Sequence, residues 1–276
     1  MISQKLYIKR QYKKLFNKKI NLKNPTTFAE KIQWLKLNDH NEKIILYADK
    51  FKVREHVKNM IGEEYLIPMF GAWDSSEEID FDELPDSFVL KPNNSSGHVL
   101  ICENKSKLDW KSAFNTMKKW DKENLTKVTG EWVYEKIPYK IVGEKLLSGD
   151  IKDYKLYFAD GKFICTQVIS ERRTGRKVFH YYDENWNLLN IFRYNFPKPS
   201  KPIEKPAKYE EMIKIATTLS EKFNFIRVDL YYVDDKIYFG ELSFYPSNGF
   251  VRYETEEMDR FFSEKINLPL KQRGEK

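Results

Sequence analysis

FIRVDLYYVDDKIYFGELSFYPSNG, residues 225–249, has the pattern of two β-strands joined by a tight turn. Apolar and aromatic residues alternate with polar ones on either side of Asp234–Asp235, which predicts a hairpin turning at that pair. Arg227 and Asp229 are two residues apart, so they lie on the same face of the first strand. A turn centred on Asp234–Asp235 pairs Asp229 within one position of Glu241. The hairpin therefore predicts two carboxylates and one arginine on a single sheet face.

This predicted face is a candidate magnesium site. Magnesium takes oxygen ligands, usually one or two carboxylates together with phosphate oxygens. Ser243 shares a face with Glu241 and would be a third oxygen donor, while Arg227 could hold a phosphate or a transition-state oxyanion. An exposed sheet face with cross-strand ion pairs would use the same residue types. The apolar residues at alternate positions of both strands favour a functional site over plain surface.

A second polar pattern occupies residues 88–98, FVLKPNNSSGH. A predicted strand delivers Lys91, and a small, polar turn follows that contains Ser95, Ser96 and Gly97. Small residues let backbone N–H groups approach phosphate oxygens, and a lysine can offset phosphate charge. The pattern lacks the GxxxxGK[ST] spacing of a Walker loop. An ordinary hairpin turn is the alternative interpretation.

A third pattern is EWVYEKIP, residues 131–138, which we interpret as a strand ending at a proline. A strand at Glu135, Lys136 and Ile137 could offer backbone donors and acceptors to the edge of an adenine. Glu144 follows closely and could accept hydrogen bonds from ribose hydroxyls. Ordinary charged residues of a linker are the alternative.

Composition excludes several classes of protein. The 276 residues are 41% apolar and 32% charged, which indicates a folded globular chain rather than a disordered one. The two cysteines form no CxxC pair, and no apolar run is long enough to span a membrane or to form the core of a signal peptide. We therefore expect a cytoplasmic protein. No nucleic-acid-binding signature is present, so we expect no nucleic acid partner.

The net charge of +7 implies attraction to polyanions, and much of the excess lies near the start of the chain. Residues 5–20 have apolar positions at helical spacing with lysines and an arginine opposite them. Such a helix could pack onto the rest of the protein with a solvated basic face. It could instead make a peripheral contact with the anionic inner face of the membrane.

The remaining patterns mix helices and strands. PTTFAEKIQWLKL reads as a capped helix, and DYKLYFADGKFICTQVIS as a hairpin turning at Ala-Asp-Gly. The regular βαβ rhythm of a doubly wound fold is missing. We therefore predict an α+β fold with two lobes. The cluster ERRTGRK, residues 171–177, is either a solvated turn or a loop that binds an anionic acceptor.

Together and in this order, these patterns resemble the ATP-grasp superfamily over roughly residues 45–250. Asp49-Lys50 is similar to an early element of that superfamily, and Lys91 with its loop resembles the strand lysine and phosphate-covering loop. Residues 133–137 resemble the adenine hinge. Arg227-Val-Asp229 followed by Glu241-Leu-Ser243 resembles the late RxD and ExN pattern, with serine in place of the expected asparagine. More narrowly, DYKLYFADGKFI and GELSFYPSNGF resemble the teichuronopeptide-biosynthesis branch, which is tied to polysaccharide and capsule loci.

The resemblance implies a fold, a ligand set and an activity. It implies an ATP-grasp-like α+β fold in which two lobes hold the nucleotide between them: a helical N-terminal segment 1–45, a first lobe 46–138, and a second lobe 139–276 with the metal site. It implies ATP and Mg²⁺ as cofactors. Nucleotide contacts fall to Lys50, Lys91, Ser95, Ser96, Gly97, Glu135, Lys136, Ile137 and Glu144, metal ligation to Asp229, Glu241 and Ser243, and catalysis to Arg227 and Lys155.

The implied activity is ATP-dependent ligation. A carboxylate on a small-molecule or polymer-precursor acceptor would become an acylphosphate and then be attacked by an amine, during cell-surface polysaccharide or teichuronopeptide synthesis. Two alternatives stay open: a kinase of the same fold that phosphorylates a sugar hydroxyl, and a glycosyltransferase of capsule synthesis.

Overall fold

The computed structural model describes residues 3–121, 130–148, 151–171, 175–220 and 223–269. The chain divides into two compact units. Unit 1 contains residues 1–40, 152–230 and 243–276, and unit 2 contains residues 41–151 and 231–242. Both units combine helices with antiparallel strands, which confirms the predicted α+β class.

The larger sheet has five strands in the order β7-β6-β5-β8-β9. Its strands are β5 (Lys152–Ala159), β6 (Lys162–Ser170), β7 (Val178–Tyr182), β8 (Ile226–Val233) and β9 (Lys236–Ser243). Both predicted hairpins exist. Asp234 and Asp235 have φ values of 50° and 57°, and Asp160 and Gly161 have 49° and 71°. Two consecutive left-handed residues give the turn whose twist matches the flanking strands.

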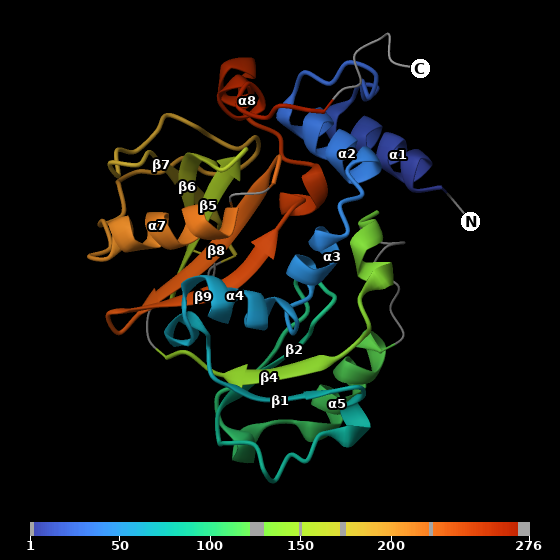
Figure 1. Ribbon diagram of the computed structural model, residues 1–276, viewed down its shortest axis with the longest axis vertical. Helices are drawn as coiled ribbons and strands as arrows, with labels where there is room; N and C mark the ends of the chain where they lie inside the picture. The colour runs from blue at the N-terminus through green and yellow to red at the C-terminus, as the bar shows by residue number, and fades with distance from the viewer. Residues whose placement is uncertain (1–2, 122–129, 149–150, 172–174, 221–222, 270–276) are drawn as a thin grey trace. The chain divides into compact units, whose positions relative to one another are not determined.

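Helices pack beside this sheet in unit 1. They are α1 (Gln4–Phe16), α2 (Phe28–Asn38), α7 (Tyr209–Ser220) and α8 (Glu256–Ser263), and α7 contacts β5 and β6 (Figure 1). The predicted cap of α2 is present, because Thr27 accepts from the Glu30 N–H while Glu30 accepts from the Thr27 N–H. Helix α1 buries Ile8 and Tyr12 completely. The α1 segment therefore forms the predicted helix and packs through its apolar stripe.

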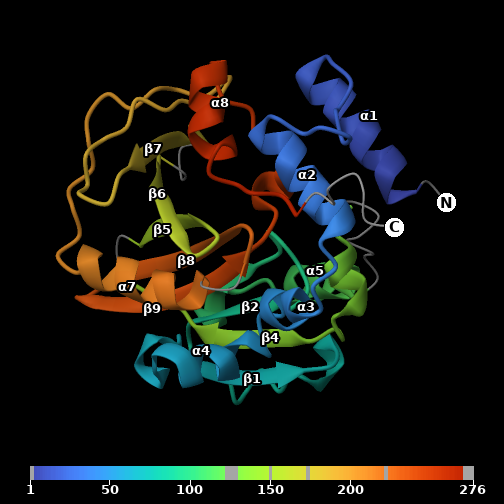
Figure 2. The same ribbon diagram turned by 45° about the horizontal axis from the view of Figure 1, so that its top comes forward.

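Unit 2 is built on a four-stranded antiparallel sheet with the order β1-β4-β2-β3 (Figure 2). The strands are β1 (Met69–Trp73), β2 (Phe88–Pro92), β3 (Leu100–Cys102) and β4 (Ile141–Lys145), and the helices are α3 (Lys43–Ala48), α4 (Val53–Ile61) and α5 (Trp110–Trp120). Phe88 and Leu90 pack with Met117 and Trp120 of α5 in a buried core. Lys91 and Val89 point to the opposite face, because side chains alternate along a strand.

The strand predicted over residues 131–138 is wrong. Residues Trp132–Lys136 form a 3-10 helix, η4. In a strand, Val133, Glu135 and Ile137 would share one face. Val133 and Ile137 are buried but Glu135 is exposed, so the burial does not follow the alternation of a strand.

Two other local patterns form only in part. The sequence ADKFKVREHVKNMIG, residues 48–62, has a helical pattern, but helix α4 begins only at Val53 and is capped by Gly62, and a separate helix, α3, precedes it. The sequence RKVFHYYDENWNLL, residues 176–189, has the pattern of a hairpin, but only its first strand, β7, forms, and an isolated bridge joins Tyr182 to Leu188. Among the described residues, no helix is long and apolar enough to cross a membrane.

Candidate active site

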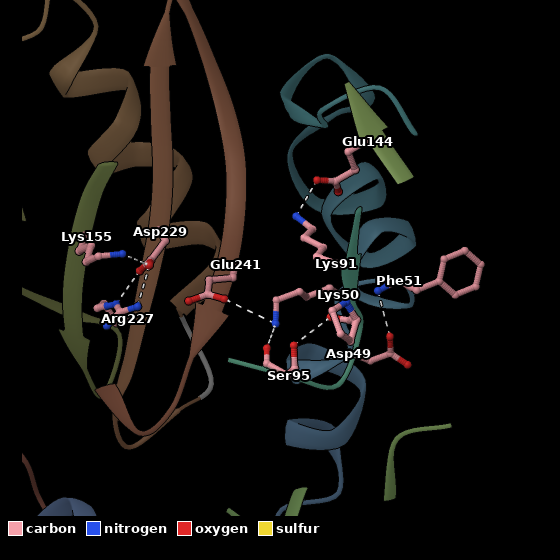
Figure 3. A network of polar contacts seen from close by, with 11 residues as sticks. Asp49, Lys50, Phe51, Lys91, Ser95, Glu144, Lys155, Arg227, Asp229 and Glu241 are labelled. Atoms are coloured by element: carbon pink, nitrogen blue, oxygen red, sulfur yellow. Dashed lines mark hydrogen bonds and ion pairs between the residues drawn. The ribbon is translucent and has the colours of Figure 1, made fainter. Parts of the chain in front are cut away.

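One group of charged residues lies in unit 1, on strands β5 and β8. Arg227 contacts the Asp229 carboxylate with two nitrogens, at 2.5 Å from Nε to Oδ1 and 2.6 Å from Nη2 to Oδ2. Lys155 Nζ donates to the same carboxylate and lies 3.0 Å from Oδ1 of Asp153 (Figure 3). The side chains of Lys155, Arg227 and Asp229 are 8%, 10% and 2% exposed. We call Asp153, Lys155, Arg227 and Asp229 the unit 1 charge cluster.

The unit 1 charge cluster balances its own charge, with two cations and two carboxylates. Burial alone raises the pKa of Asp229, but Arg227 and then Lys155 more than offset this effect and hold that pKa below its ordinary value. Asp229 is therefore ionised at neutral pH, as a metal ligand or a phosphate-site carboxylate must be. The structure thus brings both predicted catalytic residues, Arg227 and Lys155, to one predicted metal ligand.

A second group of charged residues lies in unit 2. Lys91 Nζ is 2.6 Å from Oε2 of Glu144, and Arg54 Nη1 is 3.0 Å from Oε1 of the same carboxylate. Lys50 Nζ lies 3.7 Å from Oε2 of Glu241 and donates to the backbone oxygen of Ser95 (Figure 3). We call Lys50, Arg54, Lys91, Glu144 and Glu241 the unit 2 charge cluster.

The three cations of the unit 2 charge cluster share two carboxylates, Glu144 and Glu241. Glu144 is shared by two cations, and the Lys50–Glu241 separation is longer than a hydrogen bond. Burial lowers the pKa of Lys50 first, and the positive charge of Lys91 adds to that effect, while Glu241 opposes it. Two lysines that repel each other beside a shared carboxylate favour the binding of an additional anion.

Buried polar residues hold the unit 2 charge cluster in place. The Asp49 carboxylate accepts from the N–H groups of Phe51 and Lys52 and from the amide of Asn93. The Asn93 amide also donates to the Pro138 carbonyl, and its oxygen accepts from the Lys140 N–H. Asp49 and Asn93 thereby fix Lys50, the turn after β2 and the start of β4 relative to one another.

The turn after β2 has the openness that a phosphate contact requires. Ser95 is buried, whereas Ser96 and Gly97 are exposed. Gly97 has a φ of +87°, and a Cβ placed there would meet no heavy atom within 4 Å. This left-handed position suits glycine and leaves the backbone accessible.

The adenine and ribose contacts stay predictions. Glu135 and Lys136 are exposed on η4 and Ile137 is buried, so the backbone there presents a helical turn instead of a strand edge. Glu144 forms ion pairs with Lys91 and Arg54, so in this structure it neutralises these two cations. Sequence reasoning missed Arg54 and the bridging role of Asn93. A polar residue directly after a buried strand was the available signal for Asn93.

The residues predicted to bind magnesium are single carboxylates and do not form a cluster of several ligands. Within the described ranges there is no group of three or more histidine, cysteine, aspartate or glutamate residues placed to hold a metal ion. Magnesium commonly takes only one or two protein carboxylates and completes its shell with phosphate oxygens and water. The Glu241 side chain is 33% exposed and ionisable, so it fits this role, and Ser243 ends β9. Asp229 fits by chemistry but shares its oxygens with Arg227 and Lys155.

Part of the predicted acceptor loop has no structural account. Arg172 and Arg173 lie outside the described residues, and Arg176 is exposed.

The two sheets, with basic and acidic side chains on β2, β4, β5, β8 and β9, have the fold of ATP-grasp ligases. A D-alanine–D-alanine ligase from Helicobacter pylori matches with a TM-score of 0.54 and 13% identity, over 87% of this chain and 69% of that one. The chain belongs to the TupA-like ATP-grasp family, whose model matches residues 30–267. The resemblance seen in the sequence is thus confirmed.

Other solved structures match with lower scores. A D-alanine–D-alanine ligase from Bacillus anthracis complexed with ATP gives a TM-score of 0.43 and 20% identity, over 72% of this chain and 53% of that one. An N5-carboxyaminoimidazole synthetase from Staphylococcus aureus complexed with ADP gives 0.46 and 16%, over 77% and 50%. The chain therefore spans about half of the length of these two enzymes. A comparison with curated proteins finds no match.

Proposed function

We propose that this protein is an ATP- and magnesium-dependent ligase that joins a carboxylate to an amine through an acylphosphate. The observation that carries the proposal is the neighbouring pair Lys50 and Lys91 in a chain of the ATP-grasp family. Lys50 lies 3.7 Å from its carboxylate partner Glu241, and Lys91 shares Glu144 with Arg54. A D-alanine–D-alanine ligase shares this fold. A triphosphate would supply the anion that the unit 2 charge cluster lacks.

The chain's own residues divide the work of phosphoryl transfer. Lys50, Lys91 and the open turn at Ser96 and Gly97 would hold phosphate oxygens. Arg227 and Lys155 would steady the transferring group, because fixed cations stabilise the negative charge that develops on its oxygens. Mg²⁺, held by Glu241 and Asp229 with Ser243 as a weaker donor, would supply charge neutralisation between phosphate groups.

The proposed reaction has two steps. An oxygen of the acceptor carboxylate attacks the γ-phosphorus of ATP, the bond to the bridging oxygen breaks, and ADP leaves. The nitrogen of an amine then attacks the acyl carbon, the bond to the phosphate oxygen breaks, and the amine loses one proton. Positioning and electrostatics suffice for both steps, so no side-chain nucleophile is required.

We further propose that the acceptor belongs to cell-surface polysaccharide or teichuronopeptide synthesis, on the cytoplasmic side of the membrane. The branch resemblance of residues 153–164 and 240–250 supports this setting. The basic helix α1 offers a route to the anionic inner leaflet.

The test is product analysis with magnesium-ATP and panels of amino acids and uronic acids. ADP, inorganic phosphate and a joined product are expected. ADP with a phosphorylated acceptor would identify a kinase instead. A thermal shift with a UDP-sugar and none with millimolar magnesium-ATP would overturn the proposal in favour of a glycosyltransferase.

A further inference from the structure

A row of polar side chains crosses one face of the larger sheet within unit 1. Lys155 on β5 pairs with Gln167 on β6, and Gln167 pairs with Tyr181 on β7. Directly paired residues point to the same face of a sheet. The Gln167 amide nitrogen lies 2.6 Å from the Tyr181 hydroxyl. The row thus starts at the unit 1 charge cluster and runs to the hydroxyl of Tyr181.

Arg193 lies at the far end of this row. Its Nε donates to the Tyr181 hydroxyl at 2.9 Å, and its Nη1 lies 3.3 Å from the Ser247 hydroxyl. The guanidinium also stacks over the Phe179 ring, 4.2 Å from its centroid. Arg193 is 9% exposed. A guanidinium has five N–H donors, so most of its hydrogen-bonding capacity is left for a ligand.

The neutralisation of Arg193 differs from that of the other enclosed arginines. Arg227 is paired with Asp229, and Arg54 is paired with Glu144. Across the part of the chain that the structure describes, Arg193 makes contact with hydroxyls and a ring but with no carboxylate. An enclosed charge without a counter-charge is costly. An anionic ligand would remove that cost, and a planar carboxylate matches the guanidinium fork.

The guanidinium reaches a surface where a ligand can approach. Ser247 is exposed, and residues 247–249 all have left-handed backbone conformations, with φ values of 53°, 54° and 72°. Gln33 and Lys36 donate to the Asn248 carbonyl at 2.7 and 2.8 Å, which fixes this unusual turn. The exposed Ser247 in this fixed turn is therefore the polar group through which Arg193 reaches the surface.

We propose that Arg193 binds a second carboxylate of the acceptor, distinct from the carboxylate that becomes activated. This inference rests on the proposed function, which places the reacting carboxylate at Arg227 and Lys155. Lys155 and Tyr181 are two strands apart, and neighbouring strands are separated by about 4.8 Å, so the backbones at the two ends of the row are about 10 Å apart. The acceptor is thus an extended molecule with at least two carboxylates, such as a short acidic peptide or a uronic acid oligomer.

Calorimetric titration with matched probes tests this assignment. The first probe is the tripeptide glutamyl-glycyl-glycine, and its control is glutaminyl-glycyl-glycine, which lacks one carboxylate. Trigalacturonate is the sugar counterpart. We expect at least one of the two carboxylate-rich probes to bind the wild type at least 10-fold more tightly than the glutaminyl control. Arg193→Gln should abolish this preference.

Arg252→Gln is the matched control variant, because Arg252 is an exposed arginine that pairs with the same chain segment: its carbonyl accepts a hydrogen bond from the Tyr194 N–H. It should keep the preference. Ser247→Ala removes a single hydrogen bond at the surface, so it tests the site even where Arg193→Gln fails to fold, and it should reduce the preference several-fold. Equal binding of all probes by the wild type, or an unchanged preference in both site variants, overturns the assignment.

Nucleotide binding separates this inference from the proposed function. Arg193→Gln should keep the thermal shift produced by magnesium-ATP. A wild-type protein that binds magnesium-ATP but shows no preference for the carboxylate-rich probes refutes only the role of Arg193. A wild-type protein that does not bind magnesium-ATP refutes the proposed function.

Discussion

The two charge clusters use the same residue types in different ways. The unit 1 charge cluster contains as many carboxylates as cations, and Asp229 is 2% exposed with both oxygens engaged. In the unit 2 charge cluster, Glu144 pairs with two cations, and Lys50 lies 3.7 Å from the Oε2 atom of Glu241. The charges of the unit 1 cluster balance without a ligand, whereas an anionic ligand would balance the remaining positive charge of the unit 2 cluster.

This difference separates stability from binding. Removing one partner of a compensated buried cluster leaves uncompensated charge, which destabilises the fold. Removing one cation from a cluster with excess positive charge relieves repulsion, and the loss is felt when the anionic ligand binds. Substitutions in unit 1 should therefore change the free energy of unfolding, and substitutions in unit 2 should change ligand affinity.

Asp229→Asn should have the largest effect. It leaves Arg227 and Lys155 buried beside a neutral amide, and breaking a buried pair in this way costs about 3–5 kcal/mol. Urea denaturation at neutral pH measures this loss. The control is Asp234→Asn in the exposed hairpin turn, which should stay within about 0.5 kcal/mol because asparagine tolerates a φ of 50°. Equal midpoints for the two variants would show that the unit 1 charge cluster is not compensated internally.

The pH dependence of stability also tests whether Asp229 is stabilised by its cationic partners. The pKa of Asp229 is held below its ordinary value in the folded protein, so its ionised form stabilises the fold above the unfolded pKa, near 3.8. This contribution is lost as the pH falls through the lower folded pKa. Asp229→Asn should therefore lose less stability than the wild type on acidification below about pH 4. A parallel loss in both proteins would contradict the assigned direction.

Lys91→Met should weaken magnesium-ATP binding more than it destabilises the fold. Glu144 keeps Arg54 as its partner, so no carboxylate is left without a cation. We expect a Kd increase of at least about 10-fold, equivalent to about 1.4 kcal/mol, with a change in unfolding free energy below about 1 kcal/mol. Calorimetry and denaturation on the same sample give both numbers. Lys145→Met, at the exposed end of β4, is the control that should leave both values unchanged.

Lys50 predicts proton uptake on nucleotide binding. Burial lowers its pKa in the free protein, and a bound phosphate would raise that pKa again. Between the lowered value and 10.5, the free protein is partly deprotonated at Lys50, and binding should take up a fraction of a proton. Calorimetry in two buffers of different ionisation enthalpy measures this fraction at alkaline pH. Its absence in Lys50→Met would identify the group, and undiminished uptake in that variant would exclude Lys50.

Sequence reasoning recovered what local patterns encode. Alternation around Asp234–Asp235 predicted β8 and β9, and the stretch PTTFAEKIQWLKL predicted the capped helix α2. It failed at residues 132–136, where aromatic and β-branched residues indicate a strand, but where Glu135 is exposed although it would share a strand face with the buried Val133 and Ile137. Such burial depends on neighbours that are distant in the chain.

The candidate sites show the same difference between contacts within one strand, which the sequence predicts, and contacts between distant segments, which it does not. Arg227 and Asp229 could be placed together because they share one strand. The role of Arg193 could not be predicted, because its partners come from β7 and from the turn at Ser247. Long-range register, rather than residue type, decides which cations have a carboxylate partner.

Helix α1 carries a third set of cations and should show the smallest effect on the fold. Lys5, Lys9, Arg10, Lys13 and Lys14 are exposed, whereas Ile8 and Tyr12 are buried. Replacing these five cations by glutamine should leave the free energy of unfolding unchanged within about 1 kcal/mol, since surface substitutions seldom matter more.

The same replacement should abolish binding to anionic vesicles. Each cation near an anionic leaflet contributes about 1 kcal/mol, which screening removes within a Debye length of about 8 Å at physiological salt. Unlike Lys50, these cations are fully hydrated, so their attraction should be salt-sensitive and independent of magnesium-ATP. Co-sedimentation with anionic and neutral vesicles at two salt concentrations decides the matter. Equal sedimentation of the wild type with both kinds of vesicle would remove the membrane role and leave α1 as a packing element, because Ile8 and Tyr12 already account for its position.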